Sequence, residues 1–455
     1  MNPHEPNLNN FLVPNHTSTL AANRAIVLVS RAALKNQHAL WNAHLPFVRP
    51  YFAVKSNPDP HLLRWMKQIS VATGKDENKH WKPIGVALPR TSGAGKTETY
   101  PTHEVGYGVD CASPAEMRLA LASGFKSSDI LYANTMKGAE DLKAAIGLGV
   151  GRTTVDSVEG VEQLHAERQG SDTEAIVRIA VDDTGSRSPF SVKFGAHRHE
   201  WRQVMDAISA LKVRFGGVSF HVGSASGSTT AWSDAIRRCR EFQQVCKIQR
   251  IPTLDIGGGF LPNGWHFAQV AQGIVSALAE WRASNEASAP ESVIAEPGRF
   301  FSAPVETLIV PIMFKKESTD RVRYVLDDSV YGQFSGIVYD HAKPAWRLWN
   351  GRPRPTGTKQ ALFFGRTCDS LDLIATQDNA PQYKVGDRFV FPWMGAYTSA
   401  SATRFNGFEL PKRVYLEREG GVWNGLFEEL APVPDARYPI ETNSNISLSV
   451  SQGGE

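Results

Sequence analysis

The sequence contains few cysteines and no long apolar run. Its 4 cysteines, at positions 111, 239, 246 and 368, have neither the spacing of a zinc site nor the density of a disulfide-rich domain. We therefore expect reduced thiols and no bound metal. No apolar stretch is long enough to span a membrane, and the opening MNPHEPNLNN lacks the basic start and apolar stretch of a secretion signal. These absences predict a cytoplasmic protein without a membrane partner.

Charge of one sign is also scarce. The 455 residues carry a formal net charge of only +3, and no run of Lys and Arg or basic patch with interleaved aromatics occurs. Nucleic acid is therefore not an expected partner. With 42% hydrophobic residues, the chain can bury one large core and a second, smaller one.

The sequence does contain a repeated alternation of strand-like and helical segments. Eight β-rich runs occur in the order YFAVK, YGVDCA, ILYA, TTVD, IVRIAV, GVSFHV, PTLDI and SVIAE. Several spacers, such as PAEMRLALAS and AEDLKAAIGLG, have helical periodicity. Eight such units in roughly 250 residues fit a (β/α)8 barrel better than an open doubly wound sheet. We predict an α/β fold with a TIM-like barrel over residues 31–305.

A second domain is predicted beyond the barrel. The runs ETLIVPIMF, RVRYVLDD, ALFFGR, DRFVFPW and RVYLERE are strand-like, with few helical spacers. They indicate a β-rich domain, sandwich-like or barrel-like, over residues 306–440. The early run AIVLVS, within residues 1–30, is expected to join it, which leaves the barrel inserted between two parts of this domain. The polar tail 441–455 is predicted to be disordered.

Residues 72–105 do not fit the alternation. They are polar, rich in Gly and Pro, and too long for an ordinary connection, so we treat them as a loop insertion in the barrel. The stretch SGAGKT within them resembles a phosphate-binding P-loop. However, Arg90 stands where that motif needs glycine, and no strand precedes it, so nucleotide binding is not predicted.

Lys55 needs a chemical explanation, because it stands at the end of the apolar run YFAV. An unpaired buried ammonium is costly, so this side chain must reach solvent, find a partner or lose its charge. A lone lysine at a strand end usually reaches solvent. A buried lysine of lowered pKa can instead form a Schiff base. Lys55 alone leaves both interpretations open.

Two loops after the last predicted barrel strands favour a phosphate site, as is common in such barrels. The loop GGGF at 257–260 lets backbone N–H groups approach an anion, and PGRFF at 297–301 supplies the charged fork of Arg299. His221 and Ser224 follow the sixth strand at the same rim. Combined with Lys55 and Glu296, these residues predict a pyridoxal 5'-phosphate site, in which Glu296 keeps the pyridine nitrogen protonated.

The motifs together resemble the eukaryotic ornithine decarboxylases, within the barrel group that includes diaminopimelate decarboxylase and alanine racemase. The resemblance runs from about Pro50 to Phe408. It is carried by PYFAVKSN, GVDCASPAEM, ILYANTMK, VRIAVDDTGSRSPFSVKFGA, GVSFHVGSAS, LDIGGGF, IAEPGRFF, YGQFSGIVYDH, GRTCDSLD and WMGAYTSASATRFNGF, in family order. It implies that family's fold, an amino-terminal barrel with a β domain built from both chain ends.

The resemblance also implies roles for residues that match the family. Lys55 corresponds to the Schiff-base lysine, His221 stacks on the cofactor ring and Glu296 pairs with the ring nitrogen. The implied phosphate ligands are Ser224, Gly258, Gly259, Arg299 and Tyr397. Three further residues match positions near the lysine and the ring, namely Asp110, Glu116 and Arg178.

The implied substrate site is shared between two chains. Cys368 matches the cysteine that reprotonates the product across a dimer interface, and Phe405 matches an aromatic there, so the resemblance implies an obligate homodimer with shared active sites. Asp340 and Asp369 match two acids that receive the distal ammonium of ornithine, and Tyr339 adjoins the first. The expected substrate is therefore a basic L-amino acid, most of all L-ornithine, which would give putrescine for polyamine biosynthesis.

Two alternatives stay open. Departures from the family, such as KSNPDP after the lysine and NTMK in place of a Pro-Cys pair, allow a decarboxylase of a modified amino acid in specialised metabolism. A catalytically inactive relative, like the antizyme inhibitors, would act by binding a regulator. Racemisation is disfavoured, because the racemases of this fold place arginine against the ring nitrogen where this chain has Glu296.

Overall fold

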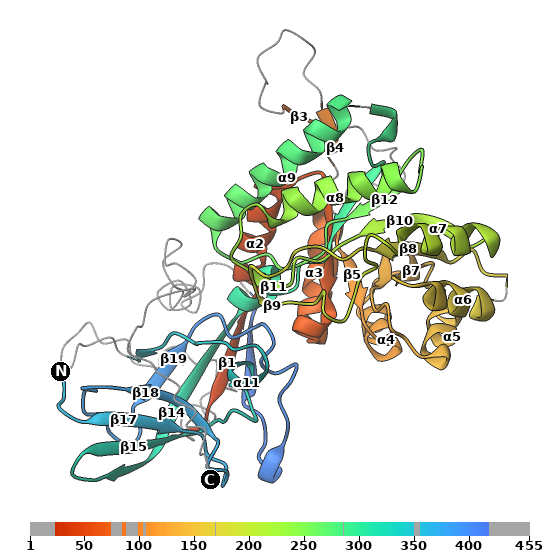
Figure 1. Cartoon of the computed structure of the whole chain (residues 1–455). Coiled ribbons are helices and arrows are strands. Elements are labelled where there is room, and N and C mark those ends of the chain that lie inside the picture. Colours follow the sequence, from red (N-terminus) through yellow and green to blue (C-terminus); the bar gives the residue numbers. More distant parts are fainter. Residues whose placement is uncertain are drawn as a thin grey trace, which may run out of the picture. The chain divides into compact units, whose positions relative to one another are not determined.

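The computed structural model describes residues 23–73, 84–87, 99–102, 106–168, 170–284, 286–349 and 355–417. The chain forms two compact units (Figure 1). Residues 35–301 form one, here called the barrel unit, and residues 1–34 with 302–455 form the other, here called the β unit. The predicted boundaries of 31 and 305 therefore lie within four residues of the division.

The barrel unit contains a closed barrel of eight parallel strands, which confirms the predicted fold class. In chain order the strands are β2 (Val48–Ala53), β5 (Gly108–Cys111), β6 (Ile130–Tyr132), β7 (Arg152–Val155), β8 (Glu174–Arg178), β10 (Arg214–Ser219), β12 (Thr253–Asp255) and β13 (Ser292–Ala295). Strand β13 closes the barrel on β2, with Ile294 opposite Arg49. Each strand overlaps one predicted run, in the predicted order.

Amphipathic helices precede or connect these strands, and Figure 1 shows them around the barrel. They are α2 (Arg31–His44), α3 (Pro60–Thr73), α4 (Pro114–Ala122), α5 (Ala139–Gly147), α6 (Val158–Glu167), α7 (Trp201–Ala210), α8 (Ala231–Val245) and α9 (Gly264–Ser284). Helices α4 and α6 begin at serine caps, since Ser113 and Ser157 accept the N–H groups of Glu116 and Gly160. Each such cap stabilises its helix by about 1 kcal/mol.

The β unit contains an eight-stranded mixed sheet. Its strands are β16 (Arg347–Leu348), β19 (Arg388–Phe391), β14 (Glu306–Glu317), β15 (Arg321–Leu326), β17 (Gln360–Phe364) and β18 (Leu373–Gln377), together with β1 (Ile26–Ser30) and β20 (Lys412–Leu416). Strand β1, the predicted run AIVLVS, pairs antiparallel with β14 and parallel with β20. The β unit is thus built from both ends of the chain.

Lys55 differs from the expectation of a buried strand residue. Strand β2 ends at Ala53, and Lys55 lies in the 3-10 turn η2 (Val54–Ser56). The Ser56 hydroxyl donates to the Ala53 carbonyl at 2.8 Å, which favours the turn over further strand pairing. The Lys55 side chain is 39% exposed, so its ammonium is not deeply buried.

Two parts of the predicted organisation fall largely outside the described residues. Within the insertion 72–105, the structure describes the end of α3 and the antiparallel pair β3 (Ile84–Ala87) and β4 (Thr99–Thr102), with Val86 opposite Tyr100. The SGAGKT stretch and the tail 441–455 are not among the described residues. Within the described part of the chain, no helix has both the length and the apolar character needed to cross a membrane.

Candidate active site

Lys55 and Asp110 lie together at the rim formed by the carboxyl ends of the barrel strands. Ala53 and Asp110 are opposite each other on β2 and β5, and Lys55 Nζ lies 3.5 Å from Asp110 Oδ2. Burial raises the pKa of Asp110, while the charges of Lys55 and Arg178 oppose that rise. Asp110 Oδ1 has no hydrogen-bond partner among the described residues. This rim therefore holds an amine beside a buried carboxyl group with an unused oxygen.

Glu116 occupies the first turn of α4, beside the same strand. Its Oε2 accepts the Ala112 N–H at 2.6 Å, while Ser113 accepts the N–H of Glu116 itself, so the carboxyl is fixed by a reciprocal cap. Burial raises the pKa of Glu116, and the nearby Asp110 raises it further. Glu116 therefore lies near enough to Asp110 for each carboxylate to disfavour ionisation of the other.

Glu296 and Asp255 form a buried carboxyl pair on neighbouring strand ends. Asp255 is 0% exposed, and its Oδ1 accepts the Gly257 N–H at 2.9 Å. The Glu296 N–H donates to the Gly257 carbonyl at 2.7 Å, which brings the two segments together. Burial raises the pKa of Asp255 to about 7 and that of Glu296 well above its ordinary value. Such a pair retains a proton near neutral pH, because two buried carboxylates repel each other.

Asp255 was not predicted as a site residue. The available signal was its position on the strand that leads into the GGGF loop.

Arg178, at the end of β8, supplies positive charge near both Asp255 and Glu296, and burial lowers its pKa. The Arg178 guanidinium also lies 5.0 Å from the centre of the Phe194 ring.

The predicted phosphate residues of the barrel also meet. Arg299 Nη2 donates to Ser224 Oγ at 3.1 Å, and both side chains are buried. A Cβ at Gly258 would lie 2.5 Å from the Glu296 carbonyl oxygen and 2.8 Å from His221 Nε2. At Gly259, whose φ is +96°, a Cβ would lie 2.5 Å from the Gly223 carbonyl oxygen. Both positions therefore require glycine, and the loop passes close to Glu296, which directly follows β13.

His221 is buried and neutral at this rim. Its Nδ1 accepts the Gly223 N–H at 3.0 Å, which leaves the proton on Nε2. Burial lowers the pKa of His221 well below its usual value, and the charges of Arg178 and Lys55 act in the same direction. The Phe190 ring lies 4.8 Å from the imidazole, at an interplanar angle of 55°.

Phe190 belongs to a rim segment that carries part of the family resemblance, although the sequence assigned no role to Phe190 or Asp183. Asp183 fixes this segment, because its Oδ2 accepts the N–H groups of Phe190 at 2.5 Å and of Ser191 at 2.7 Å. Strand β9 (Ser186–Ser188), in the same segment, pairs antiparallel with β11 (Ser224–Ser226). The segment 183–196 is therefore anchored to the loop that carries Ser224.

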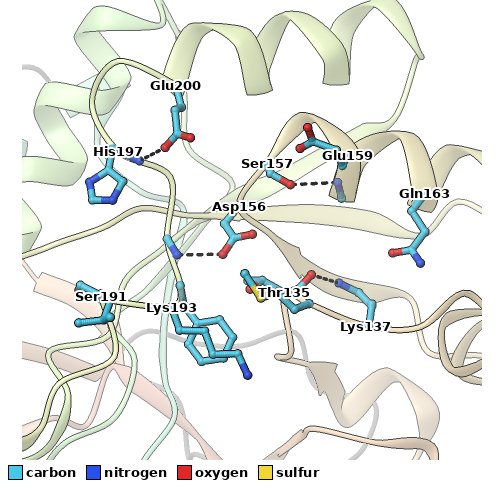
Figure 2. Close-up of a pocket in the computed structure, with 15 residues that line it drawn as sticks. Thr135, Lys137, Asp156, Ser157, Glu159, Gln163, Ser191, Lys193, His197 and Glu200 are labelled. Carbon is cyan, nitrogen blue, oxygen red and sulfur yellow. Dashed lines mark hydrogen bonds between the residues drawn. The ribbon is translucent and has the colours of Figure 1, made fainter.

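A cavity of about 670 Å³ lies beyond this segment, at the ends of β6 and β7 (Figure 2). Lys137 lines it and donates to the carbonyl oxygens of Asn134 and Thr154, while burial lowers its pKa to about 8. Asp156 accepts the Gly195 N–H at 2.8 Å from the opposite wall. None of the predicted site residues lines this cavity. Phe194, whose ring contacts the predicted residue Arg178, does line it.

Three predicted residues come together in the β unit. The N–H of Cys368 donates to Asn406 Oδ1 at 3.1 Å, and the thiol-bearing residue is exposed. Asp369 accepts the Leu371 N–H at 2.9 Å and the hydroxyl of Tyr331, and these hydrogen bonds lower its pKa. The Tyr331 ring stacks on Phe405 with ring centres 4.2 Å apart. Tyr331 and Asn406 were not predicted.

The other predicted residues of the β unit lie on neighbouring segments. Tyr339 ends α11 (Gly336–Tyr339) and is 68% exposed, whereas Asp340 follows it and is 7% exposed. Tyr397 has a left-handed backbone with φ of +56°. Its carbonyl accepts the Ser401 hydroxyl at 3.3 Å.

A barrel rim with a lysine, a buried acid pair and a glycine and arginine anion site defines a pyridoxal-dependent barrel protein. The chain belongs to the ornithine decarboxylase-like family of pyridoxal phosphate-dependent decarboxylases. Residues 101–303 match the family described as pyridoxal-dependent decarboxylase, pyridoxal binding domain, which confirms the predicted family and cofactor.

Similar proteins include decarboxylases and an antizyme inhibitor. Ornithine decarboxylase of Schizosaccharomyces pombe is 33% identical over 391 residues, which cover 83% of this chain and 80% of that protein. Antizyme inhibitor 2 of Xenopus laevis is 36% identical over 327 residues, 67% of this chain and 70% of that protein. The structure of lysine/ornithine decarboxylase from Vibrio vulnificus with cadaverine has a TM-score of 0.71 and 26% identity, covering 90% of this chain and 100% of that one.

Proposed function

We propose that the protein decarboxylates a basic L-amino acid, L-ornithine before lysine or arginine, and releases the amine, putrescine from ornithine. The observation that carries the proposal is Glu296, a buried acid whose proton is retained beside Asp255. With the cofactor bound, this proton would pass to the ring nitrogen and the Glu296 carboxylate would keep that nitrogen protonated, which strengthens electron withdrawal and favours decarboxylation over racemisation. The similarity to decarboxylases of ornithine and lysine supports the same reading.

The residues present fit pyridoxal phosphate. Lys55 supplies an amine at the rim, and the unused Oδ1 of Asp110 can accept a further hydrogen bond. The buried pair of Arg299 and Ser224 supplies an anion site beside the glycine loop, where side chains would clash. We propose that Tyr397 completes the phosphate site, on the basis of its family match.

Each residue then has one task. Held by these residues, pyridoxal phosphate would supply an electron sink for the substrate α-carbon, which would allow carbon dioxide to leave. Glu296 would keep the ring nitrogen protonated by pairing with it as a carboxylate. Lys55 provides the amine that attaches the cofactor, and Asp110 lies 3.5 Å from that amine. His221, neutral and fixed by Gly223, offers a flat face for the ring without adding charge.

Protonation of the α-carbon is assigned to the thiol of Cys368 of the partner subunit. The exposure of Cys368 within its own β unit is compatible with a site completed by a second chain. Asp340 and Asp369 are proposed to receive the distal ammonium of the substrate, because Asp369 remains ionised and charged pairs recognise a cationic side chain. The homodimer and the cytoplasmic location remain predictions.

Two alternatives have specific support. The departures from the family near Lys55 allow a modified amino acid as substrate. The similarity to antizyme inhibitor 2 supports a binding protein without catalysis. Against the second alternative, every cofactor residue that the family match assigns is present in this chain.

The deciding experiment is a panel of L-amino acids assayed for carbon dioxide release, with product amines identified by mass. We expect wild type to release carbon dioxide from ornithine. Lys55→Ala should lose both this release and the absorbance of bound cofactor. The control Lys67→Ala, which removes a lysine paired with Asp129, should lose neither. If carbon dioxide is released only from a neutral or bulkier amino acid, that amino acid would replace ornithine as the proposed substrate. A folded wild type that binds no cofactor and releases no carbon dioxide would favour the regulator.

A further inference from the structure

Five residues of the β unit, Cys368 among them, are linked in a closed loop by two hydrogen bonds, one ring stacking contact and two peptide bonds. They are Tyr331, Cys368, Asp369, Phe405 and Asn406, here called the thiol cluster. Asn406 accepts the Cys368 N–H, Tyr331 donates to Asp369, and Tyr331 stacks on Phe405 at an interplanar angle of 21°. The two residues with proposed catalytic or substrate roles are adjacent in sequence, and each has its own supporting side chain.

Asn406 has a backbone that restricts which residues can occupy its position. Its φ of 57° and ψ of 14° lie in the left-handed region, which asparagine and glycine tolerate best. Glycine would meet the backbone requirement alone. Asparagine adds a side-chain carbonyl, and that carbonyl lies 3.1 Å from the Cys368 nitrogen. The side chain therefore has a task beyond permitting the turn.

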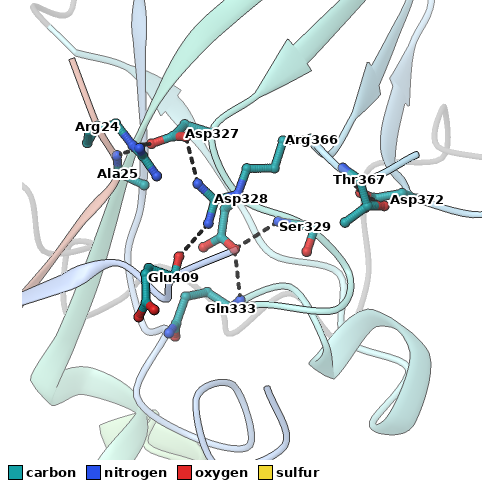
Figure 3. A network of polar contacts seen from close by, with 10 residues as sticks. All are labelled: Arg24, Ala25, Asp327, Asp328, Ser329, Gln333, Arg366, Thr367, Asp372 and Glu409. Atoms are coloured by element: carbon teal, nitrogen blue, oxygen red, sulfur yellow. Dashed lines mark hydrogen bonds and ion pairs between the residues drawn. The ribbon is translucent and has the colours of Figure 1, made fainter. Parts of the chain in front are cut away.

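The turn that carries Cys368 is fixed on both sides of the cysteine. Asp372 is 0% exposed and accepts the Thr367 N–H at 3.1 Å and the Val330 N–H at 2.9 Å (Figure 3). Arg366 pairs with the buried Asp327 at 2.9 Å. These contacts hold the neighbours of Cys368. The hydrogen bond to Asn406 differs from them, because the Cys368 backbone itself donates it.

Asn406 is fixed in turn by its own neighbours. The Thr403 N–H donates to the Tyr331 carbonyl at 2.7 Å, which joins the segment of Asn406 to the segment of Tyr331. The Gly407 N–H donates to the Arg404 carbonyl at 2.8 Å and closes the turn around Asn406. A displacement of Asn406 would consequently disturb Tyr331 and Phe405 together.

We propose that Asn406 is a positioning residue that sets the direction of the Cys368 thiol, and that Tyr331 does the same for the Asp369 carboxylate. The inference rests on the proposed function for the roles of Cys368 and Asp369. The hydrogen bonds themselves do not depend on that function. Asn406 acts on the proton-delivery step, and Tyr331 acts on recognition of the substrate's distal ammonium.

The test compares two substitutions at one position. Asn406→Gly keeps the left-handed backbone and removes the acceptor, whereas Asn406→Asp keeps both. We expect Asn406→Gly to lower kcat about tenfold with KM within about twofold, and Asn406→Asp to retain kcat within about threefold. Tyr331→Phe, which keeps the ring on Phe405, should instead raise KM for ornithine several-fold.

A second measurement is independent of activity. Hydrogen exchange of the peptide spanning residues 366–372 should show one protected amide lost in Asn406→Gly and retained in Asn406→Asp, because only the first lacks an acceptor for Cys368. Unchanged protection in Asn406→Gly, or equal losses of kcat in both variants, would overturn the positioning role. If wild type has no decarboxylase activity, the proposed function fails, while the exchange result still decides whether Asn406 fixes Cys368.

Discussion

At the scale of single residues, burial sets the protonation of the barrel rim. Desolvation is the largest influence on Asp110, Asp255 and Glu296, and it raises the pKa of each. The cations Lys55 and Arg178 oppose this rise at Glu296. The rim therefore retains a proton on the acid pair, while its lysine and arginine supply the positive charge for an anionic cofactor.

The proton retained by Asp255 predicts how stability depends on pH. Because burial raises its pKa to about 7 from 3.8, its neutral form stabilises the fold fully below about pH 4, and this contribution is lost as pH rises through 7. Asp255→Asn removes the ionisation. We expect urea unfolding of the cofactor-free variant to lose less stability than wild type between pH 4 and pH 8. The exposed Asp206→Asn serves as control, and a parallel pH dependence of wild type and Asp255→Asn would contradict the assignment.

Asp369 predicts the substrate class. Removing its carboxylate in Asp369→Ala should lower kcat/KM for ornithine by roughly ten- to a hundredfold, because a charge-assisted hydrogen bond to the distal ammonium is lost. Cofactor absorbance should not change. The matched control is Asp378→Ala, at an aspartate that accepts a hydrogen bond from Gln360 elsewhere in the β unit. An equal loss of kcat/KM for a neutral amino acid would show that Asp369 does not recognise the positive charge of the substrate side chain.

Some site residues could be predicted from the sequence and others could not. Lys55, Glu296, Arg299 and the GGGF loop stand at strand ends, where the alternation of segments already indicates a shared rim. Asp255 and Asn406 matter only through a neighbour that lies far along the chain or in another turn. Periodicity reports which face a residue occupies, and it does not report such pairwise contacts.

At the scale of elements, a strand or helix could be predicted where its apolar residues contrast clearly with the polar residues around them. The barrel strands are short buried runs between amphipathic helices, and all eight were predicted. Strand β18, LIATQ, is mostly half-exposed, and β9 (SRS) and β11 (SAS) contain no large apolar residue. None of these three strands therefore has a strong apolar signal. The turn η2 was mistaken for strand because the bond between Ser56 and Ala53 is local and leaves the apolar pattern unchanged.

The turn after β15 depends on one buried carboxyl group. Asp328 Oδ1 accepts the N–H groups of Ser329 at 2.8 Å and Gln333 at 3.1 Å, and burial raises its pKa to about 7 (Figure 3). Asp328→Ala should destabilise the β unit by about 1–3 kcal/mol for each amide left without an acceptor. Asp328→Asn keeps the acceptor oxygen, so its thermal unfolding should stay near wild type. A similar loss in both variants would mean that the charge, rather than the acceptor, holds the turn.

At the scale of the whole molecule, the proposed active site draws on residues from two units. The barrel unit carries Lys55, Glu296 and Arg299, and the β unit carries Cys368 and Asp369. The β unit is assembled from both chain ends through β1, β14 and β20. The order of segments predicted this assembly. The pairing of one chain's thiol with the other chain's lysine follows only from the family match. The hydrophobic pattern of a single chain carries no information about a second chain.

A mixture of two inactive variants tests this sharing of sites. Lys55→Ala chains lack the cofactor amine and Cys368→Ala chains lack the thiol, so each homodimer should have little activity. In a mixed dimer with shared sites, one site loses both residues and the other keeps both. Random exchange of equal amounts should therefore restore about one site in four. Activity near that fraction, with exchange verified by mass spectrometry, supports the two-chain site. Sites contained within one chain would instead leave every combination inactive, because each chain would then lack either its lysine or its thiol.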